Sequence, residues 1–174
     1  VGELIYGFYQ RISGLPNIGG FFQGEDMGHK TGTLIAPDEL RRHVLPWHKK
    51  YVDLAHKNGL IYILHACGNL ETIMEDLISD VKIDAKHSFE DEIIPVARFK
   101  AKYGPRIGVL GGVDVDKLCR LPEPELRKYV TNILNECMPG GGYALGSGNS
   151  VASYVPVENY LTMLDEGLRW GAGD

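Results

Sequence analysis

The chain has 174 residues, of which 44% are hydrophobic and 24% charged, as expected for one globular domain. Its net charge is −5 and it has no run of Lys or Arg, so nucleic acid is not an expected partner. The longest apolar stretch, Leu60 to Leu64, is too short to cross a bilayer, so we expect no membrane contact.

The cysteines and the first residues carry information about the cell compartment. Three cysteines form no disulfide framework and fit a reducing cytoplasm, which is the location we predict. The start Val1-Gly2-Glu3 lacks the charged segment of a signal peptide. Because residue 1 is Val and not Met, we expect further residues upstream.

Strand-like and helix-like segments alternate along the chain. Residues 3–12 are expected to end a helix, and residues 18–23 to form a strand. Pro37 begins a helix whose apolar residues recur every three or four positions, up to a C-cap at Asn58-Gly59. Further strands are predicted over 60–66, 81–85, 107–110 and 143–145, each followed by a helix, over 70–78, 92–103, 124–137 and 157–170.

Short apolar strands that alternate with amphipathic helices predict an α/β fold with a parallel sheet. Each βα unit takes roughly 30 to 40 residues, which is the repeat of a (β/α)8 TIM barrel. No Gly-x-Gly-x-x-Gly follows a strand, so an open dinucleotide-binding sheet has no support. We therefore predict that residues 1–174 are the C-terminal portion of a single TIM barrel, with about five βα units present.

In such barrels the reactive groups lie where the strands end. Five polar segments follow the five predicted strands, whereas the turns at the opposite face are plainer. These segments are residues 24–30, 65–69, 84–91, 111–116 and 146–150. We expect one functional face at these strand ends.

The most specific pattern is His65-x-Cys67. Residues i and i+2 of a strand point to the same side, and imidazole and thiolate are natural zinc ligands. Cys119 is a candidate third ligand, and Glu25, Asp26 or His29 could supply an oxygen or nitrogen. The alternative interpretation is a buried Cys beside a hydrogen-bonded His at the end of a strand, without a metal.

Other candidates follow the same strand ends. We assign catalytic roles to five of them: Glu25, Asp26, His29, Lys86 and Asp114. Loop capping ahead of the Pro37 helix is the alternative for the first three. For Lys86 the alternative is a structural ion pair with Asp84, Asp114 or Asp116. We assign substrate binding to six more, with the alternative for the glycine segment being a tight turn: Asn69, His87, Gly146, Ser147, Gly148 and Asn149. The three histidines of the Pro37 helix are expected to be surface or packing residues: His43, His48 and His56.

Three motifs in order resemble the uroporphyrinogen decarboxylase superfamily: His65-Ala-Cys-Gly-Asn-Leu70, Gly111-Gly-Val-Asp114 and Pro139-Gly-Gly-Gly-Tyr-Ala-Leu-Gly-Ser-Gly148. The resemblance runs from about Gly24 to the C-terminus. It implies a TIM barrel that serves one of two activities. One is cofactor-free decarboxylation of uroporphyrinogen, and the other is methyl transfer that involves corrinoid proteins, often with a zinc-bound thiol.

The resemblance is incomplete at the last strand. The decarboxylases carry a His after Leu-Gly-x-Gly, where this chain has Asn149. The second zinc Cys of the methyltransferases would also fall near Asn149. The catalytic Asp and the substrate-binding Arg residues of the decarboxylases belong to earlier strands. The resemblance therefore implies that this chain alone lacks a complete active site.

Charge favours one of the two activities. Uroporphyrinogen carries eight carboxylates, yet the strand ends here hold more acidic than basic residues, which disfavours it. We predict a corrinoid-linked methyltransferase or demethylase that acts on a small methylated substrate. Its predicted cofactors are zinc and a corrinoid carried by a partner protein, with none in the decarboxylase alternative. Further predicted partners are the N-terminal part of the barrel or a homo-oligomer partner. A third alternative is an inactive fragment or structural module.

Overall fold

The computed structural model describes residues 1–173. The chain divides into two compact units, Val1–Lys86 and His87–Asp174. A five-stranded sheet has its strands in sequence order, β1-β4-β5-β6-β7. Its strands are β1 (Gly20–Glu25), β4 (Ile61–Ala66), β5 (Ala85–His87), β6 (Gly108–Leu110) and β7 (Tyr143–Ala144). The β1–β4 and β6–β7 pairs are parallel. The predicted α/β fold of TIM-barrel type, with five strands in sequence order, is confirmed.

Seven α-helices and two shorter helical turns lie in the described residues. The α-helices are α1 (Gly2–Ile12), α2 (Pro37–His43), α3 (Leu45–Lys57), α4 (Val96–Tyr103), α5 (Val115–Arg120), α6 (Glu123–Cys137) and α7 (Val157–Ala172). The turns are the 3-10 helix η1 (Glu71–Ile73) and the π-helix η2 (Asp76–Val81). Two short strands, β2 (Gly28–His29) and β3 (Gly32–Thr33), form an antiparallel hairpin that the sequence did not predict.

Prolines explain two differences from the predicted helices. The single helix expected from Pro37 to Lys57 is divided into α2 and α3, because Pro46 stands in the first turn of α3. The helix expected from residue 92 begins only at Val96, directly after Pro95, which fits a proline at a helix start. These corrections move helix boundaries and leave the order of the elements unchanged.

The segment between β4 and β5 differs more from its prediction. Instead of an α-helix over 70–78 and a strand over 81–85, it holds η1, η2 and then β5. The π-helix ends at Lys82, which adopts the left-handed conformation with φ 65°. Leu77, Ile78 and Val81 of the π-helix are buried, so its wider turn still presents an apolar face to the core.

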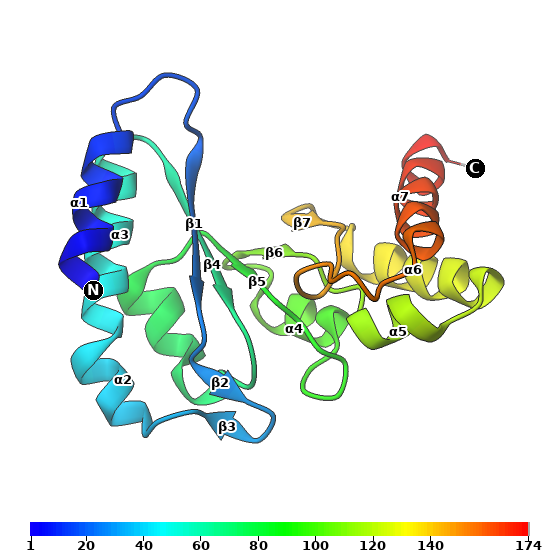
Figure 1. The fold of residues 1–174 in the computed structure, drawn as a ribbon, viewed down its shortest axis with the longest axis horizontal. Helices are drawn as coiled ribbons and strands as arrows, with labels where there is room; N and C mark the ends of the chain where they lie inside the picture. The colour runs from blue at the N-terminus through cyan, green and yellow to red at the C-terminus, as the bar shows by residue number, and fades with distance from the viewer. Residues whose placement is uncertain (174) are drawn as a thin grey trace. The chain divides into compact units, whose positions relative to one another are not determined.

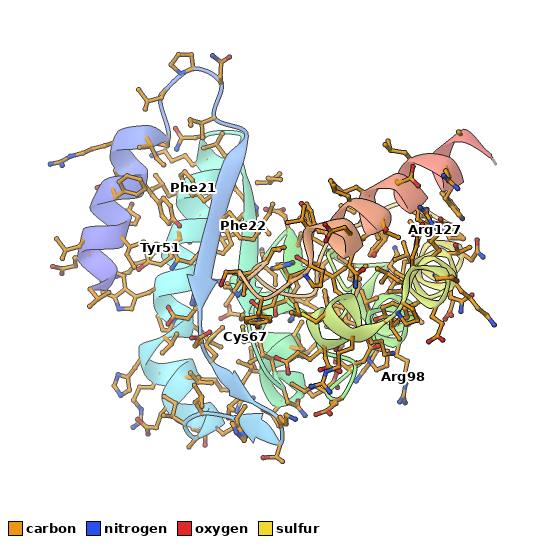
Figure 2. The ribbon with its side chains drawn as sticks, turned by 45° about the vertical axis from the view of Figure 1, so that its right-hand side comes forward. Phe21, Phe22, Tyr51, Cys67, Arg98 and Arg127 are labelled. Carbon is orange, nitrogen blue, oxygen red and sulfur yellow. The ribbon has the colours of Figure 1, made fainter. Side chains whose placement is uncertain are left out.

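One face of β1 and β4 carries the core of the first unit, and α1 and α3 cover that face (Figure 1). Phe21 stacks on Tyr9 of α1, with 4.0 Å between the ring centroids, and Tyr51 of α3 meets Tyr9 edge-on at 5.5 Å. Tyr62 of β4 is fully buried. Figure 2 shows Phe21 on the side of Tyr51 and Phe22 on the opposite side of β1. The strand therefore separates a helix-covered face from a second, more open face.

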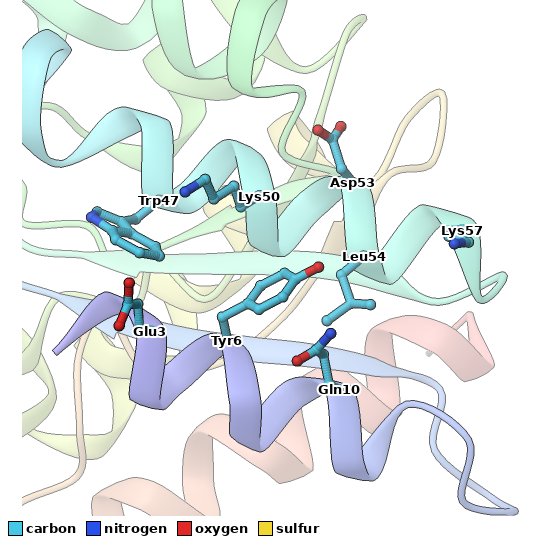
Figure 3. Close-up of a pocket in the computed structure, with 8 residues that line it drawn as sticks. All are labelled: Glu3, Tyr6, Gln10, Trp47, Lys50, Asp53, Leu54 and Lys57. Atoms are coloured by element: carbon cyan, nitrogen blue, oxygen red, sulfur yellow. The ribbon is translucent and has the colours of Figure 1, made fainter.

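A groove of about 550 Å³ lies between α1 and α3 (Figure 3). Tyr6 of α1 reaches between Lys50 and Leu54 of α3. The remaining lining residues are Trp47, Gln10 and three charged side chains, Glu3, Asp53 and Lys57. Because both helices lie on the covered face of β1 and β4, this groove is on the side away from His65.

Helices α6 and α7 pack against each other in the second unit. Arg127 of α6 joins them through ion pairs to Asp165 at 2.7 Å and Glu166 at 3.1 Å. Thr131 donates a further hydrogen bond to Glu166 at 2.6 Å. The pair is therefore held by buried apolar contacts and by one cation that serves both helices.

The opposite face of α7 is also apolar. Four aliphatic side chains at spacings of four, three and four residues form an outer stripe on it: Val157, Leu161, Leu164 and Leu168, exposed by 65, 56, 40 and 76%. The residues of α7 that face its own unit, such as Met163, lie on the other side of the helix. A helix that is apolar on two opposite faces is typical of one that is buried on both.

Among residues 1–173, no helix combines the length and the apolar character needed to cross a membrane.

Candidate functional site

The predicted site residues fall into two groups, one in each unit. The first unit holds Glu25, Asp26, His29, His65, Cys67, Asn69 and Lys86. The second unit holds His87, Asp114, Cys119 and the segment from Gly146 to Asn149.

The register of β1 and β4 decides which side chains of the first unit share a face. The two strands pair without a break from Gly20 opposite Ile61 to Glu25 opposite Ala66, so Gly24 lies opposite His65. Directly paired residues of parallel strands point to the same side. Phe22 shares this face, and its ring lies 6.2 Å from the His65 ring in an edge-on arrangement. His65 therefore stands on the open face of the sheet.

Cys67 lies just beyond β4 and meets His65. The Cys67 Sγ is 3.4 Å from the His65 Nε2, as the i, i+2 spacing predicted. Gly68 turns the chain directly afterwards with φ 78°, and a Cβ there would lie 2.1 Å from the Gly28 carbonyl carbon. Only glycine fits such a left-handed turn against another backbone. The tight crossing of these two segments fixes the position of the thiol.

Two charged neighbours and burial set the protonation of His65. Burial lowers its pKa below the ordinary value, the Lys86 ammonium lowers it further, and the Asp26 carboxylate opposes both. The imidazole is therefore neutral at neutral pH. A neutral imidazole can accept the proton of a thiol or bind a metal ion through a ring nitrogen.

Lys86 is 4% exposed, so its ammonium lies inside the unit. Its Nζ donates to the Ala66 carbonyl oxygen at 3.4 Å, next to the His65–Cys67 pair. A buried ammonium at this position supplies a fixed positive charge to the site.

Glu25 lies on the other face of β1, away from His65. Its carboxylate Oε2 is 3.9 Å from the Nε2 of His48, which is 1% exposed, and both line a cavity of about 350 Å³. The Nδ1 of His48 is 2.8 Å from the Tyr62 hydroxyl. Burial, with a smaller contribution from Asp26, raises the pKa of Glu25, and burial lowers the pKa of His48 to about 4. Asp26, and not Glu25, therefore acts on the His65 side, and His48 is the packing residue that the sequence predicted.

The β2–β3 hairpin brings His29 and Asn69 together through their main chains. The Asn69 N–H donates to the His29 carbonyl oxygen at 2.7 Å. The Asn69 side-chain oxygen accepts from the Glu71 N–H at 3.0 Å, which caps the turn that follows. The His29 residue itself is exposed. The hairpin thus orders the loop after Cys67, while the catalytic role of His29 and the binding role of Asn69 stay predictions.

In the second unit, Asp114 is an N-cap. Its carboxylate accepts from the Asp116 and Lys117 N–H groups of α5 and from the Asp91 N–H at 2.8 Å. The Tyr129 hydroxyl donates to Asp91 at 2.9 Å, and Lys117 also pairs with Asp91. The carboxylate of Asp114 therefore accepts from three main-chain donors, a cap that the sequence analysis did not predict. The catalytic role of Asp114 stays a prediction.

The glycine segment of the second unit follows β7. The His87 Nε2 is 3.1 Å from the Ser147 carbonyl oxygen, which makes this nitrogen the protonated one. The Gly148 N–H donates to the Val113 carbonyl oxygen at 2.6 Å, and the Ser147 hydroxyl donates to the Asn149 carbonyl oxygen at 2.6 Å. One of the N–H groups expected to bind an anion is thus used within the fold, as the tight-turn alternative implies.

Zinc needs three or four protein ligands. His65 and Cys67 are two donors of the right type, but residues 1–173 contain no group of three or more His, Cys, Asp or Glu side chains arranged to hold a metal ion. Cys119 joins no such group within residues 1–173, and none of the three cysteines forms a disulfide. The described residues therefore supply an incomplete ligand set.

Two residues of the open face were missed by the sequence analysis. Phe22 is 57% exposed although it belongs to a strand, and Gly24 has no side chain at the position beside His65. The alternation of a strand over Gly20–Glu25 would have placed both on one face. The predicted strand over 18–23 stopped too early to include Gly24.

Comparison with known proteins identifies relatives of the fold. The family model described as uroporphyrinogen decarboxylase (URO-D) matches residues 21–169. No curated protein sequence matches the chain. Among the similar solved structures is a methyltransferase from Methanosarcina mazei, with 20% sequence identity and a TM-score of 0.65. The match covers 86% of this chain and 41% of the methyltransferase chain, so the present chain spans about two fifths of that protein.

Proposed function

Because the chain belongs to the uroporphyrinogen decarboxylase family, we propose that it is part of a corrinoid-linked methyltransferase or demethylase that acts on a small methylated substrate. The observation that carries the proposal is the pair of the His65 Nε2 and the Cys67 Sγ, 3.4 Å apart on the open face of the sheet. A thiolate is a good nucleophile toward a methyl carbon and a good ligand for zinc, whereas decarboxylation needs neither.

The neighbours of the pair suit this chemistry. A neutral His65 can take the proton from a thiol, which leaves the thiolate as the reactive form. In the transfer, the sulfur of a substrate thiolate forms a bond to the methyl carbon while the bond from that carbon to its former carrier breaks. The carrier leaves with the electron pair. The buried Lys86 ammonium stabilises the negative charge of the thiolate before the transfer.

Zinc and the corrinoid remain proposals. If zinc is bound, His65 and Cys67 supply two of its ligands. The other ligands would come from groups that do not lie beside this pair among residues 1–173. Zinc would supply a Lewis acid that keeps a substrate thiol deprotonated. A corrinoid on a partner protein would supply a methyl carrier. The small net negative charge and the three cysteines outside disulfides are compatible with the cytoplasmic location predicted from the sequence.

The outer stripe of α7 supports a protein partner. We propose that further βα units, the N-terminal part of the barrel, cover Leu161 and Leu164 and pair with the strand at that end of the sheet. Proteins normally cover an apolar helix face, and they normally cover the outer edge of the last strand in a sheet, which is β7 here. A homo-oligomer is the alternative occupant.

Decarboxylation is the second candidate, because the matching family carries the name of that activity. It would require cations for the carboxylates of uroporphyrinogen. The first unit offers Lys86 near His65, with Asp26 acting on the same imidazole in the opposite sense. This balance of charge favours methyl transfer.

The two candidates are separated by metal content and turnover. The protein is purified with and without Cys67→Ser, and zinc is measured together with methyl transfer and uroporphyrinogen consumption. Cys119→Ser is the matched control, because Cys119 is also partly exposed but belongs to the other unit. We expect stoichiometric zinc and methyl transfer that are lost only in Cys67→Ser. Turnover of uroporphyrinogen by a zinc-free protein would instead establish the decarboxylase.

A further inference from the structure

The cavity of about 350 Å³ that Glu25 and His48 share lies where α1 and α3 begin and β1 ends. We call it the Glu25 cavity. Its apolar and aromatic lining comes from both helices and from the residue that precedes each of them: Val1, Ile5, Val44, Trp47 and Tyr51. All of these residues belong to the first unit, and the cavity is on the helix-covered face of β1, away from Cys67.

The Glu25 carboxylate brings a negative charge to this cavity without a counter-charge. It is half-buried, and its Oε2 is 3.9 Å from the His48 Nε2, beyond hydrogen-bond distance. Burial raises its pKa and Asp26 raises it further, and no cation acts on it in the opposite sense. In the part of the chain that the structure describes, no Lys or Arg lines the cavity; Lys50 lines the groove between α1 and α3 instead. A bound cation would therefore offset the cost of burying this charge.

His48 offers a lone pair to the same cavity. Its side chain is 1% exposed, and burial lowers its pKa to about 4, so the imidazole is neutral at neutral pH and does not compete with a cation for Glu25. Its Nδ1 is 2.8 Å from the Tyr62 hydroxyl. In the tautomer whose Nδ1–H donates to that hydroxyl, the Nε2 is an acceptor on the cavity side. A carboxylate oxygen and an imidazole nitrogen then form a pair of acceptors 3.9 Å apart.

A single ammonium group matches this pair. A nitrogen about 2.8 Å from each acceptor fits between two atoms that are 3.9 Å apart, and its N–H groups can donate to both. A hydroxyl group could bridge the same two atoms, but it carries no charge to offset that of Glu25. A metal ion would need more ligands, and residues 1–173 hold no group of His, Cys, Asp and Glu suited to one.

We infer that the Glu25 cavity binds a small organic ammonium ion, whose head group lies between the carboxylate and the imidazole. Its apolar body lies against Ile5 and Val44. Because the cavity and Cys67 are on opposite faces of the sheet, this site holds whether or not the chain transfers methyl groups.

Calorimetric titration with benzylammonium tests the site, and benzyl alcohol is the uncharged ligand of the same shape. Glu25→Gln removes the charge and keeps the shape of the side chain. Asp53→Asn is the matched control, because Asp53 is an acidic residue that lines the groove between α1 and α3 and not this cavity. The NMR signal of the His48 ring locates the ligand, since His48 lines this cavity and not that groove. The titrations use the 174-residue chain and a polypeptide that also carries the proposed further βα units.

We expect benzylammonium to shift the His48 signal and to bind about tenfold more tightly than benzyl alcohol, since a hydrogen bond to a charged group is at stake. Glu25→Gln should lose this preference for the ammonium, and Asp53→Asn should bind like wild type. No binding, equal affinity for the two ligands, or a preference that Glu25→Gln keeps would overturn the ammonium site. Loss of binding in the longer polypeptide would also overturn it, by assigning the cavity to residues before Val1. The comparison of the two ligands needs wild type alone, so it decides the matter even if Glu25→Gln does not fold.

Discussion

Replacing His48 should remove a defined part of the acid sensitivity of folding. His48 is 1% exposed, and its Nδ1 lies 2.8 Å from the Tyr62 hydroxyl, within hydrogen-bond distance. Burial lowers its pKa to about 4 from an ordinary value of 6.5. Gln has no titrating group, and its side-chain oxygen can still accept from Tyr62. His48→Gln therefore removes the proton-binding group and keeps the hydrogen bond.

The sign follows from the two pKa values. The unfolded chain binds a proton at His48 more readily than the folded chain, so stability is complete above pH 6.5 and is lost as the pH falls toward 4. Between pH 7.5 and 5.0 this one group should lower the free energy of unfolding by about 2 kcal/mol. The carboxyl of Glu25, 3.9 Å away, also titrates, but it is present in both proteins.

Urea unfolding at pH 7.5 and pH 5.0 tests the value. The difference between the two pH values should be about 2 kcal/mol smaller in His48→Gln than in wild type. His43→Gln is the control, because that side chain is 64% exposed and should leave the difference unchanged. If His48→Gln and wild type lose the same stability on acidification, His48 is not held neutral by burial and the argument is wrong.

Three further perturbations test other parts of the structure. Arg127→Met should lower the free energy of unfolding by about 1 kcal/mol, measured in urea at low salt, because one guanidinium serves both α6 and α7; an unchanged midpoint would mean that the ion pairs contribute nothing. Leu161→Glu with Leu164→Glu should cost under about 0.5 kcal/mol in the 174-residue chain but several kcal/mol in a polypeptide that also carries the further βα units; equal costs would refute the proposed partner. Lys86→Met should raise the pKa of His65 toward its ordinary value in an NMR titration, and a pKa that stays where it is would show that Lys86 does not act on His65.

Element order was predictable from the sequence because apolar periodicity reflects burial. The boundaries of the helices were less predictable, and Pro46 and Pro95 show why. Each proline permits a helix to begin there as easily as it ends one, and tertiary packing decides between the two. The π-helix over Asp76–Val81 has no sequence signal of its own, since its buried residues also fit an α-helix spacing.

The site shows the same division between local and distant information. His65 and Cys67 could be paired from the sequence because i and i+2 share a face whatever the rest of the fold does. Glu25 and Asp26 are adjacent, so only the strand bounds and the register reveal which one acts on His65. The cap that Asp114 makes with the Asp116 and Lys117 N–H groups is local, whereas its further bond from the Asp91 N–H joins residues 23 positions apart, which no local pattern reports.

The two perturbed histidines of the first unit show how a packing residue and a reactive group can be told apart. Burial lowers the pKa of both, but for His48 it is the whole cause, and Tyr62 occupies its Nδ1 within the core. For His65 the Lys86 ammonium adds to the effect of burial and the Asp26 carboxylate opposes it, and its Nε2 is 3.4 Å from the Cys67 thiol on the open face. A shifted pKa alone would select both residues. Only His65 combines the shift with a nucleophile, so substitutions at His48 should change stability and its pH dependence, whereas substitutions at His65 should change the reactivity of Cys67.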